Sequence, residues 1–276
     1  MTTVNLEEDA LKEIADIVYQ TSGIVFKDSN LSVLISRVSS KLKEKQMESG
    51  AYLSLLKRDK NELTSFIDFV TTNFTSFFRN SRHFEMLEEV VLPEILLRKK
   101  NDKHITIWSA GSSTGEETYT IAMVICEFFE KNNFNIGEWD IRIVGSDISL
   151  ESLFIAKEAK YPGRSVNKIN PIYIEKYFIP LEDGKYFVLK ENIRKMVKFD
   201  FHNLIYDSNV GNVDITFCRN VLIYFDEDIQ KRVLSKIHSA MEKDGFLFIG
   251  HSESLVGLFD GFKPKSLGKG IVYVKQ

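Results

Sequence analysis

The segment from Ser109 to Glu117, SAGSSTGEE, combines glycines with two adjacent carboxylates. An apolar run precedes it and a helical pattern follows it, so we expect a turn between a strand and a helix. Glycines let a ligand approach the backbone closely, and a helix N-terminus offers unpaired N–H groups. The segment contains neither the GKS/T of a phosphate-binding loop nor the GxGxxG of a dinucleotide fold. Its glutamates favour a ligand with a cationic group, although an ordinary strand-to-helix turn also needs these glycines.

Polar residues follow two later strand patterns. Asp147 ends the run IRIVGSD, where a carboxylate can accept the hydroxyls of a ribose, although it can equally cap the next helix. Arg219, Asn220 and Tyr224 follow the apolar run VDITFC. Ligands of open α/β sheets bind at the carboxyl ends of the strands, so these residues predict a substrate pocket. The alternative places Arg219 in a surface ion pair and Tyr224 in the core.

Strand and helix patterns alternate from residue 104 onward, which predicts a mainly parallel sheet covered on both faces. One stretch departs from this rhythm: Tyr186–Leu189, followed by Met196 and Val197, predicts a small antiparallel excursion. Upstream, Ser81 is expected to cap a helix over residues 82–100, which Pro93 kinks or splits.

The first 70 or so residues show helical spacing and no strand alternation, which predicts a small helical domain. Its first helix is expected to end at Gly23. The second is expected to bury Leu31, Leu34, Ile35, Val38 and Leu42 and to present an outer cationic face of Arg37, Lys41, Lys43 and Lys45. We therefore predict a helical domain over 1–72, a linker over 73–80 and an α/β domain over 81–276, with a β-subdomain at about 165–195.

Composition narrows the class of protein. The 276 residues are 43% hydrophobic and 27% charged, which is typical of globular proteins. The net charge of -3 gives no general attraction to nucleic acid, and no apolar stretch approaches the ~20 residues of a membrane span. Cys126 and Cys218 lack metal-ligand spacing. We expect a cytoplasmic protein without a metal, a nucleic-acid partner or membrane insertion.

Five motifs occur in a fixed order: TTNFTSFFRNSRHF, WSAGSSTGEE, GSDIS, FCRNVLIYF and GFLFIGHSE. Together they resemble the chemotaxis receptor methyltransferases, the S-adenosylmethionine-dependent protein-glutamate O-methyltransferases, over essentially the whole chain. The resemblance implies a Rossmann-like class I methyltransferase fold of the α/β class, with an all-helical N-terminal domain and an inserted antiparallel β-subdomain. The implied cofactor is S-adenosylmethionine, with S-adenosylhomocysteine as its product.

The resemblance also implies roles for individual residues. It places Tyr224 against the reacting carboxylate and counts Arg79 and Arg219 with it as catalytic. The implied cofactor-binding residues are Asn73, Thr75, Arg79, Gly111, Glu117, Asp147, Asn203, Leu204, Arg219 and Asn220. The implied partner is the cytoplasmic helical region of chemotaxis receptors, whose glutamates would meet Arg37, Lys41 and Lys43.

Methyl transfer to a carboxylate suits this residue set, because a glutamate with a pKa of ~4.3 is already ionised at neutral pH and needs no general base. We expect a monomer that methylates receptor glutamates during sensory adaptation. Three alternatives remain at this stage: a methyltransferase for another substrate, a non-catalytic receptor-binding module that senses S-adenosylmethionine, and a hydride-transferring dinucleotide enzyme. The last is disfavoured by the missing GxGxxG.

Overall fold

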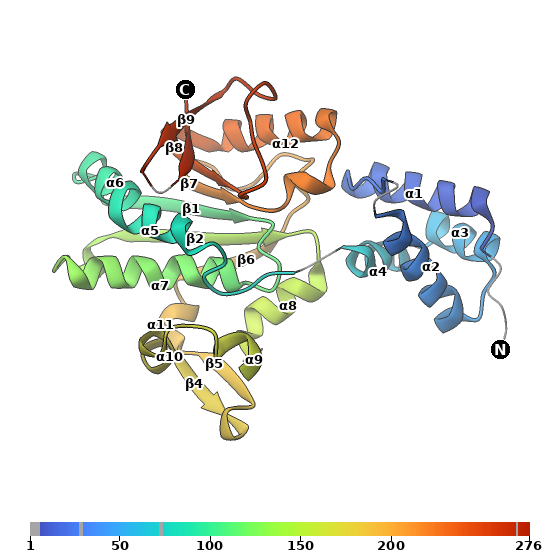
Figure 1. Ribbon diagram of the computed structural model, residues 1–276, viewed down its shortest axis with the longest axis horizontal. Helices are drawn as coiled ribbons and strands as arrows, with labels where there is room; N and C mark the ends of the chain where they lie inside the picture. Colours follow the sequence, from blue (N-terminus) through green and yellow to red (C-terminus); the bar gives the residue numbers. More distant parts are fainter. Residues whose placement is uncertain (1–5, 28–29, 72–73, 269) are drawn as a thin grey trace. The chain divides into compact units, whose positions relative to one another are not determined.

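The computed structural model describes residues 6–27, 30–71, 74–268 and 270–276, which form two compact units (Figure 1). The helical unit comprises Met1–Thr72 together with Ile223–Gln230. The sheet unit comprises Asn73–Leu222 and Lys231–Gln276. The chain therefore returns to the helical unit after most of the sheet unit in sequence. The predicted domain boundaries at 72 and 80 did not include this return.

The helical unit contains four packed helices: α1 (Glu8–Ser22), α2 (Leu31–Lys45), α3 (Ser49–Arg58) and α4 (Lys60–Val70). Gly23 ends α1 in a left-handed conformation and its N–H donates to the Tyr19 carbonyl, as expected for a C-terminal glycine. Glu62 is buried, where its carboxylate accepts from Lys45 Nζ at 2.6 Å and from the Tyr52 hydroxyl at 3.0 Å. These partners satisfy a charge that would otherwise be costly to bury.

The sheet unit is built on a seven-stranded sheet in the order β6-β2-β1-β7-β8-β10-β9. Its first five strands run parallel, and β10 and β9 pair antiparallel at the far edge. The bounds are β1 (His104–Ala110), β2 (Asp140–Asp147), β6 (Val197–Phe201), β7 (Val213–Cys218), β8 (Met241–Ile249), β9 (Phe262–Ser266) and β10 (Ile271–Lys275). The apolar runs in the sequence are these central strands, because a parallel strand is buried on both faces.

Helices cover both faces of this sheet (Figure 1). α7 (Glu116–Lys131) and α8 (Leu150–Glu158) lie on one face, and α12 (Glu227–Ala240) lies on the other. The expected helix over 82–100 is split into α5 (Ser81–Met86), a π-helical turn η1 (Leu87–Val91) and α6 (Leu92–Arg98). The residues on either side of the π-helical turn, Met86 and Leu92, keep right-handed helical backbone angles, so the segment is one helix with an internal π-turn, and Pro93 follows that turn. The predicted cap at Ser81 is wrong, since the N-cap is Asn80 in a left-handed conformation.

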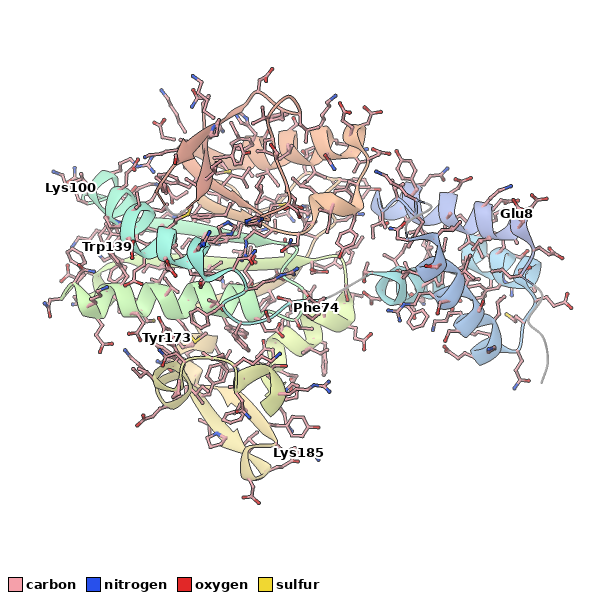
Figure 2. All side chains as sticks on the ribbon, in the orientation of Figure 1. Glu8, Phe74, Lys100, Trp139, Tyr173 and Lys185 are labelled. Atoms are coloured by element: carbon pink, nitrogen blue, oxygen red, sulfur yellow. The ribbon has the colours of Figure 1, made fainter. Side chains whose placement is uncertain are left out.

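The antiparallel excursion is a separate three-stranded sheet in the order β3-β5-β4. Its strands are β3 (Lys160–Pro162), β4 (Phe178–Leu181) and β5 (Tyr186–Leu189). The strand at Tyr186 was expected, but its predicted partner at Val197 is wrong, because Val197 begins β6 of the main sheet. The remaining short helices are η2 (Ile136–Glu138), α9 (Gly163–Val166), α10 (Pro171–Tyr177), η3 (Glu182–Gly184), α11 (Glu191–Arg194) and η4 (Leu222–Tyr224). Lys185 lies at the outer tip of this sheet (Figure 2).

Within the described residues, no helix is both long enough and apolar enough to cross a membrane.

Candidate active site

The glycine segment forms the expected turn between β1 and α7. Gly111 and Gly115 both have positive φ, of 82° and 92°. A Cβ at Gly111 would lie 2.4 Å from Val221 Cγ2, so only glycine brings the backbone this close to the turn after β7. The N–H groups of Gly111 and Ser112 donate to the Ser146 carbonyl at 2.8 and 2.9 Å, which ties the turn to the end of β2.

Asp147 lies at the end of β2 beside this turn and is only 8% exposed. One carboxylate oxygen accepts from the Ser113 N–H at 2.7 Å and the other accepts from the Ser149 N–H at 2.9 Å. The N-cap of α8 is Ser149, whose hydroxyl accepts from Ser152, so the reading of Asp147 as the cap is wrong. Asp147 instead joins two turns at the carboxyl edge of the sheet, the edge at which ligands of open α/β sheets bind.

Glu117 and Arg219 form a buried ion pair between α7 and the turn after β7. Arg219 Nη1 lies 2.8 Å from Glu117 Oε2, and the two side chains are 1% and 13% exposed. The other oxygen of Glu117 accepts from the Ser109 hydroxyl at 2.9 Å. The alternative of a surface ion pair for Arg219 is therefore wrong. A charge pair this deep is retained at a cost in desolvation, which makes it a candidate for binding a charged ligand.

Arg219 also connects the site to the linker, because its Nη2 donates to the carbonyl of Arg79. Arg219 Nε and the hydroxyl of Ser112 are buried and have no hydrogen-bond partner among the described residues. Such orphaned polar atoms mark a place where a polar ligand completes the bonding. Carboxylates and guanidinium groups suit a zwitterionic amino acid, and the acid at the end of β2 suits a ribose. The residues present therefore fit S-adenosylmethionine.

Two neighbours of this pair were not singled out from the sequence. Glu253, in the motif GHSE, accepts from the backbone N–H of Asn220 at 3.0 Å and from that of Gly250. It thereby fixes Asn220, which has a φ of 59°. His83 is buried against the Phe248 ring, and burial together with the positive charge of Arg219 lowers its pKa to about 4. The placement of GHSE at the end of β8 was the available signal for Glu253.

The other predicted cofactor residues lie after β6 and in the linker before α5. Asn203 and Leu204 follow β6, and the side chain of Asn203 accepts from the Ile205 N–H at 3.3 Å. Arg79 donates to the Phe74 carbonyl at 2.9 Å and lies over the Phe74 ring, which is 74% exposed (Figure 2). Thr75 is partly exposed. Asn73 lies outside the described residues.

Tyr224 belongs to the helical unit by its contacts, although the resemblance implied a place at the reacting centre. Its carbonyl accepts from the Val25 N–H at 2.9 Å, and its side chain is partly exposed. The reading of Tyr224 as a fully buried core aromatic therefore does not hold. The turn that carries it follows directly from Arg219 and Asn220 in sequence.

The predicted cationic face of α2 is only partly correct. Lys43 is exposed and Arg37 is partly exposed, with its guanidinium 4.7 Å from the centre of the Phe69 ring. Lys41 is wrong as an outer residue: its side chain is 11% exposed, pairs with Glu44 at 3.0 Å and lies over the Phe69 ring. The reason is helical geometry, since Lys41 lies seven residues after Leu34 and shares its buried stripe. Ile35, predicted as buried, is exposed.

Among the residues that the structure describes, no group of three or more histidine, cysteine, aspartate or glutamate side chains is arranged to hold a metal ion.

Comparison with known families shows the family to which this fold belongs. The model described as "CheR methyltransferase, SAM binding domain" matches residues 73–271, and the one described as "CheR methyltransferase, all-alpha domain" matches residues 9–71. The chain belongs to the CheR methyltransferase family. Its cofactor is S-adenosylmethionine, and the class I methyltransferase fold with an all-helical N-terminal domain predicted from the sequence is confirmed.

Curated relatives agree with this assignment. The chemotaxis protein methyltransferase of Borreliella burgdorferi is 38% identical over 263 residues, which is 92% of this chain and 91% of that protein. Chemotaxis protein methyltransferase 1 of Pseudomonas aeruginosa is 35% identical over 92% of this chain and 93% of that protein. Among solved structures, magnesium protoporphyrin IX methyltransferase from Synechocystis overlaps with a TM-score of 0.36 and 15% identity, covering 80% of this chain and 91% of that one. Because this overlap is low, the assignment rests on the sequence matches.

Proposed function

We propose that this CheR methyltransferase transfers a methyl group from S-adenosylmethionine to glutamate side chains of chemotaxis receptors and forms methyl esters (EC 2.1.1.80). Family membership over nearly the whole chain carries this proposal. The two relatives above are named chemotaxis protein methyltransferases, which supports a receptor of the chemotaxis system as the substrate. The receptor's cytoplasmic helical region is the part that presents glutamates to this enzyme.

The buried residues of the sheet unit support binding and positioning chemistry. Bound S-adenosylmethionine supplies an electrophilic methyl group on a sulfonium. The Glu117 carboxylate and the Arg219 guanidinium hold the two charged ends of its amino-acid part, and Arg79 assists from the linker. Asp147 accepts hydrogen bonds from the ribose hydroxyls. The adjoining turns contribute four further residues to the cofactor site: Gly111, Asn203, Leu204 and Asn220. Asn73 and Thr75 complete the cofactor site from the linker.

The acceptor needs orientation more than activation. A glutamate carboxylate is ionised at neutral pH, so no side chain has to remove a proton before attack. Alignment of nucleophile and electrophile contributes several of the ~7 to 11 kcal/mol available from proximity and orientation. Tyr224 orients the acceptor carboxylate through its hydroxyl in this proposal, and Arg37 and Lys43 guide the acidic receptor helix.

The decisive experiment gives the enzyme methyl-labelled S-adenosylmethionine with a receptor cytoplasmic fragment. We expect label in the fragment that alkali releases as methanol, because esters hydrolyse and methylated amines do not. A fragment whose acceptor glutamates are replaced by alanine is the control and should take up no label. Label in RNA but not in the fragment would show another substrate, and tight binding of S-adenosylhomocysteine without turnover would show a sensing module.

A further inference from the structure

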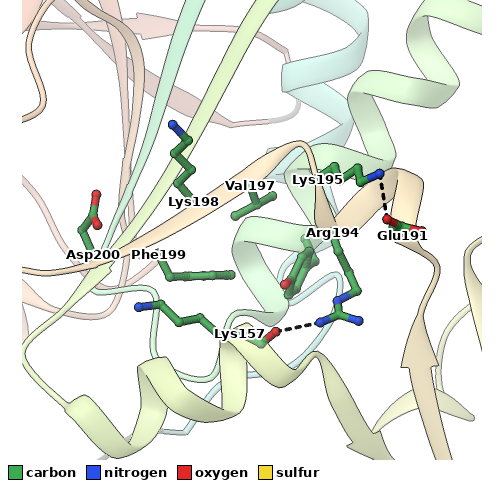
Figure 3. A pocket seen from close by; sticks show the side chains of 9 residues that line it. Lys157, Glu191, Arg194, Lys195, Val197, Lys198, Phe199 and Asp200 are labelled. Carbon is green, nitrogen blue, oxygen red and sulfur yellow. Dashed lines mark hydrogen bonds and ion pairs between the residues drawn. The ribbon is translucent and has the colours of Figure 1, made fainter.

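A groove outside the proposed active site runs along the free edge of the main sheet. It has a volume of about 530 Å³ and is lined by residues of four elements: Tyr119, Lys157, Glu191, Arg194, Lys195, Val197, Lys198, Phe199 and Asp200 (Figure 3). These residues come from α7, α8, the α11 region and β6. β6 is the terminal strand of the sheet and pairs only with β2, so one side of its backbone faces this groove.

Positive charge gathers in this groove without full compensation. Lys195 is neutralised by Glu191 at 2.7 Å. Lys157, Arg194 and Lys198 are exposed and have no carboxylate within 4.0 Å in the part of the chain that the structure describes. Arg194 is positioned by donating from Nη2 to the Lys157 carbonyl at 3.2 Å. In Figure 3, Lys157 and Arg194 lie on one side of the strand, and Lys198 and Asp200 project from the other.

The two edges of the sheet differ in a way that points to a partner at β6. At the opposite edge, β9 contains Pro264, which has no N–H and blocks addition of a further strand. β6 contains no proline, and the groove leaves space beside it. An added extended chain places its side chains alternately on the two faces of a sheet. At this edge Lys157 and Arg194 lie on one face, and Lys198 lies on the other beside Asp200.

We propose that this groove binds an extended, acidic polypeptide segment of a partner protein, which adds to the β6 edge through backbone hydrogen bonds. Glutamate or aspartate side chains of the segment meet Lys157 and Arg194 on one face and Lys198 on the other. Lys157, Arg194 and Lys198 are exposed, so their side chains can contact a chain that lies along the strand. This site is distinct from Glu117, Asp147 and Arg219, so its occupation does not require the cofactor.

The test uses a fluorescent peptide in which pairs of glutamates alternate with pairs of threonines, so that glutamates point to both faces of an added strand. It is mixed with the full-length protein and followed by anisotropy at low salt. We expect saturable binding that the triple variant Lys157→Glu, Arg194→Glu, Lys198→Glu weakens by roughly tenfold or more, because three attractive charges become repulsive. The matched control reverses three exposed cations elsewhere in the sheet unit, Lys100→Glu, Lys243→Glu and Lys263→Glu, and should bind as the unchanged protein does. Calorimetry with S-adenosylhomocysteine verifies that both variants are folded.

Strand addition has its own readout. Two peptides of the same sequence carry N-methyl groups on alternate residues, in the two possible phases. Addition to β6 predicts that one phase binds and the other does not, since only alternate N–H groups of a strand face its neighbour. The proposal would be overturned by equal affinity of the two methylated peptides or by no binding to the unchanged protein. It would also be overturned by an equal loss of affinity in the control variant or by tighter binding of a short RNA.

Discussion

At the scale of the residue, the proposed site depends on a single guanidinium with several contacts. Arg219 donates to Glu117 and to the Arg79 carbonyl from two separate nitrogens of one rigid planar group, a geometry that the single ammonium nitrogen of a lysine cannot reproduce. We expect Arg219→Lys to lower the affinity for S-adenosylhomocysteine at least about tenfold, since the Glu117 partner shifts or is lost. Calorimetry measures this. Arg98→Lys is the control, because Arg98 is exposed and also donates to a carbonyl, that of Asp244; equal affinity in both variants would contradict the role of Arg219.

Asp147 combines a structural and a proposed binding role, and the two can be separated. We expect Asp147→Ala to abolish measurable binding of S-adenosylhomocysteine while the circular dichroism spectrum stays that of a folded protein. Two backbone N–H groups lose their acceptor, so the free energy of unfolding should also fall by about 1 to 3 kcal/mol for each group that water cannot reach. Unchanged affinity in the folded variant would refute the ribose assignment.

His83 predicts a pH dependence of stability. Its pKa is about 4 in the folded protein, whereas the unfolded chain takes up this proton near the ordinary value of 6.5. Between these values the unfolded state binds more protons, so the contribution is present above pH ~6.5 and is lost as the pH falls toward 4. The loss is at most roughly 3 kcal/mol. Urea unfolding of the protein and of His83→Gln across this window should give a shallower slope for the variant; parallel curves would exclude His83 as the cause.

At the scale of the element, the turn between β1 and α7 tolerates no side chain at its last residue. Gly115 has a φ of 92°, and a Cβ there would lie 2.9 Å from Ala156 Cβ and 3.0 Å from Phe199 Cζ. We expect Gly115→Ala to lower the free energy of unfolding by about 2 to 4 kcal/mol, from strain and overpacking together. Gly184→Ala is the matched control: its φ is 85° but nothing lies within 4 Å, so only strain of ~1 kcal/mol applies. Equal losses would mean that packing at α8 and β6 plays no part.

Whether an element could be predicted from the sequence depended on how far away in the sequence its contacts lie. The buried strands at 104–110 and 213–218 and the acid at 147 were predictable, because apolar runs and the residues that end them are local signals. β3 was not, since three residues that include Pro162 carry no pattern and pair with a strand more than twenty residues later. Glu253 was overlooked because its environment is set by a residue distant in sequence, Asn220. Lys41 was misjudged although its spacing of seven residues from Leu34 was a local signal of the buried face.

At the scale of the whole molecule, charge should govern the encounter with the receptor. We expect Arg37→Glu with Lys43→Glu to lower the rate of receptor methylation several-fold at low salt, since both side chains are accessible on α2. The difference should shrink as salt is raised, because screening shortens the range of the interaction to about 8 Å at physiological ionic strength. Arg58→Glu with Lys60→Glu, two exposed cations of the same unit, is the control. If both pairs of changes act alike, receptors dock elsewhere.

The return of Ile223–Gln230 to the helical unit has a consequence for inheritance. The four helices and this short return lie about 150 residues apart in the sequence, so no single contiguous segment of the chain contains the complete unit. A recombination event at residue 72 would transplant the helices without the piece that packs with them. We therefore expect gene rearrangements to keep the two units together in one coding sequence.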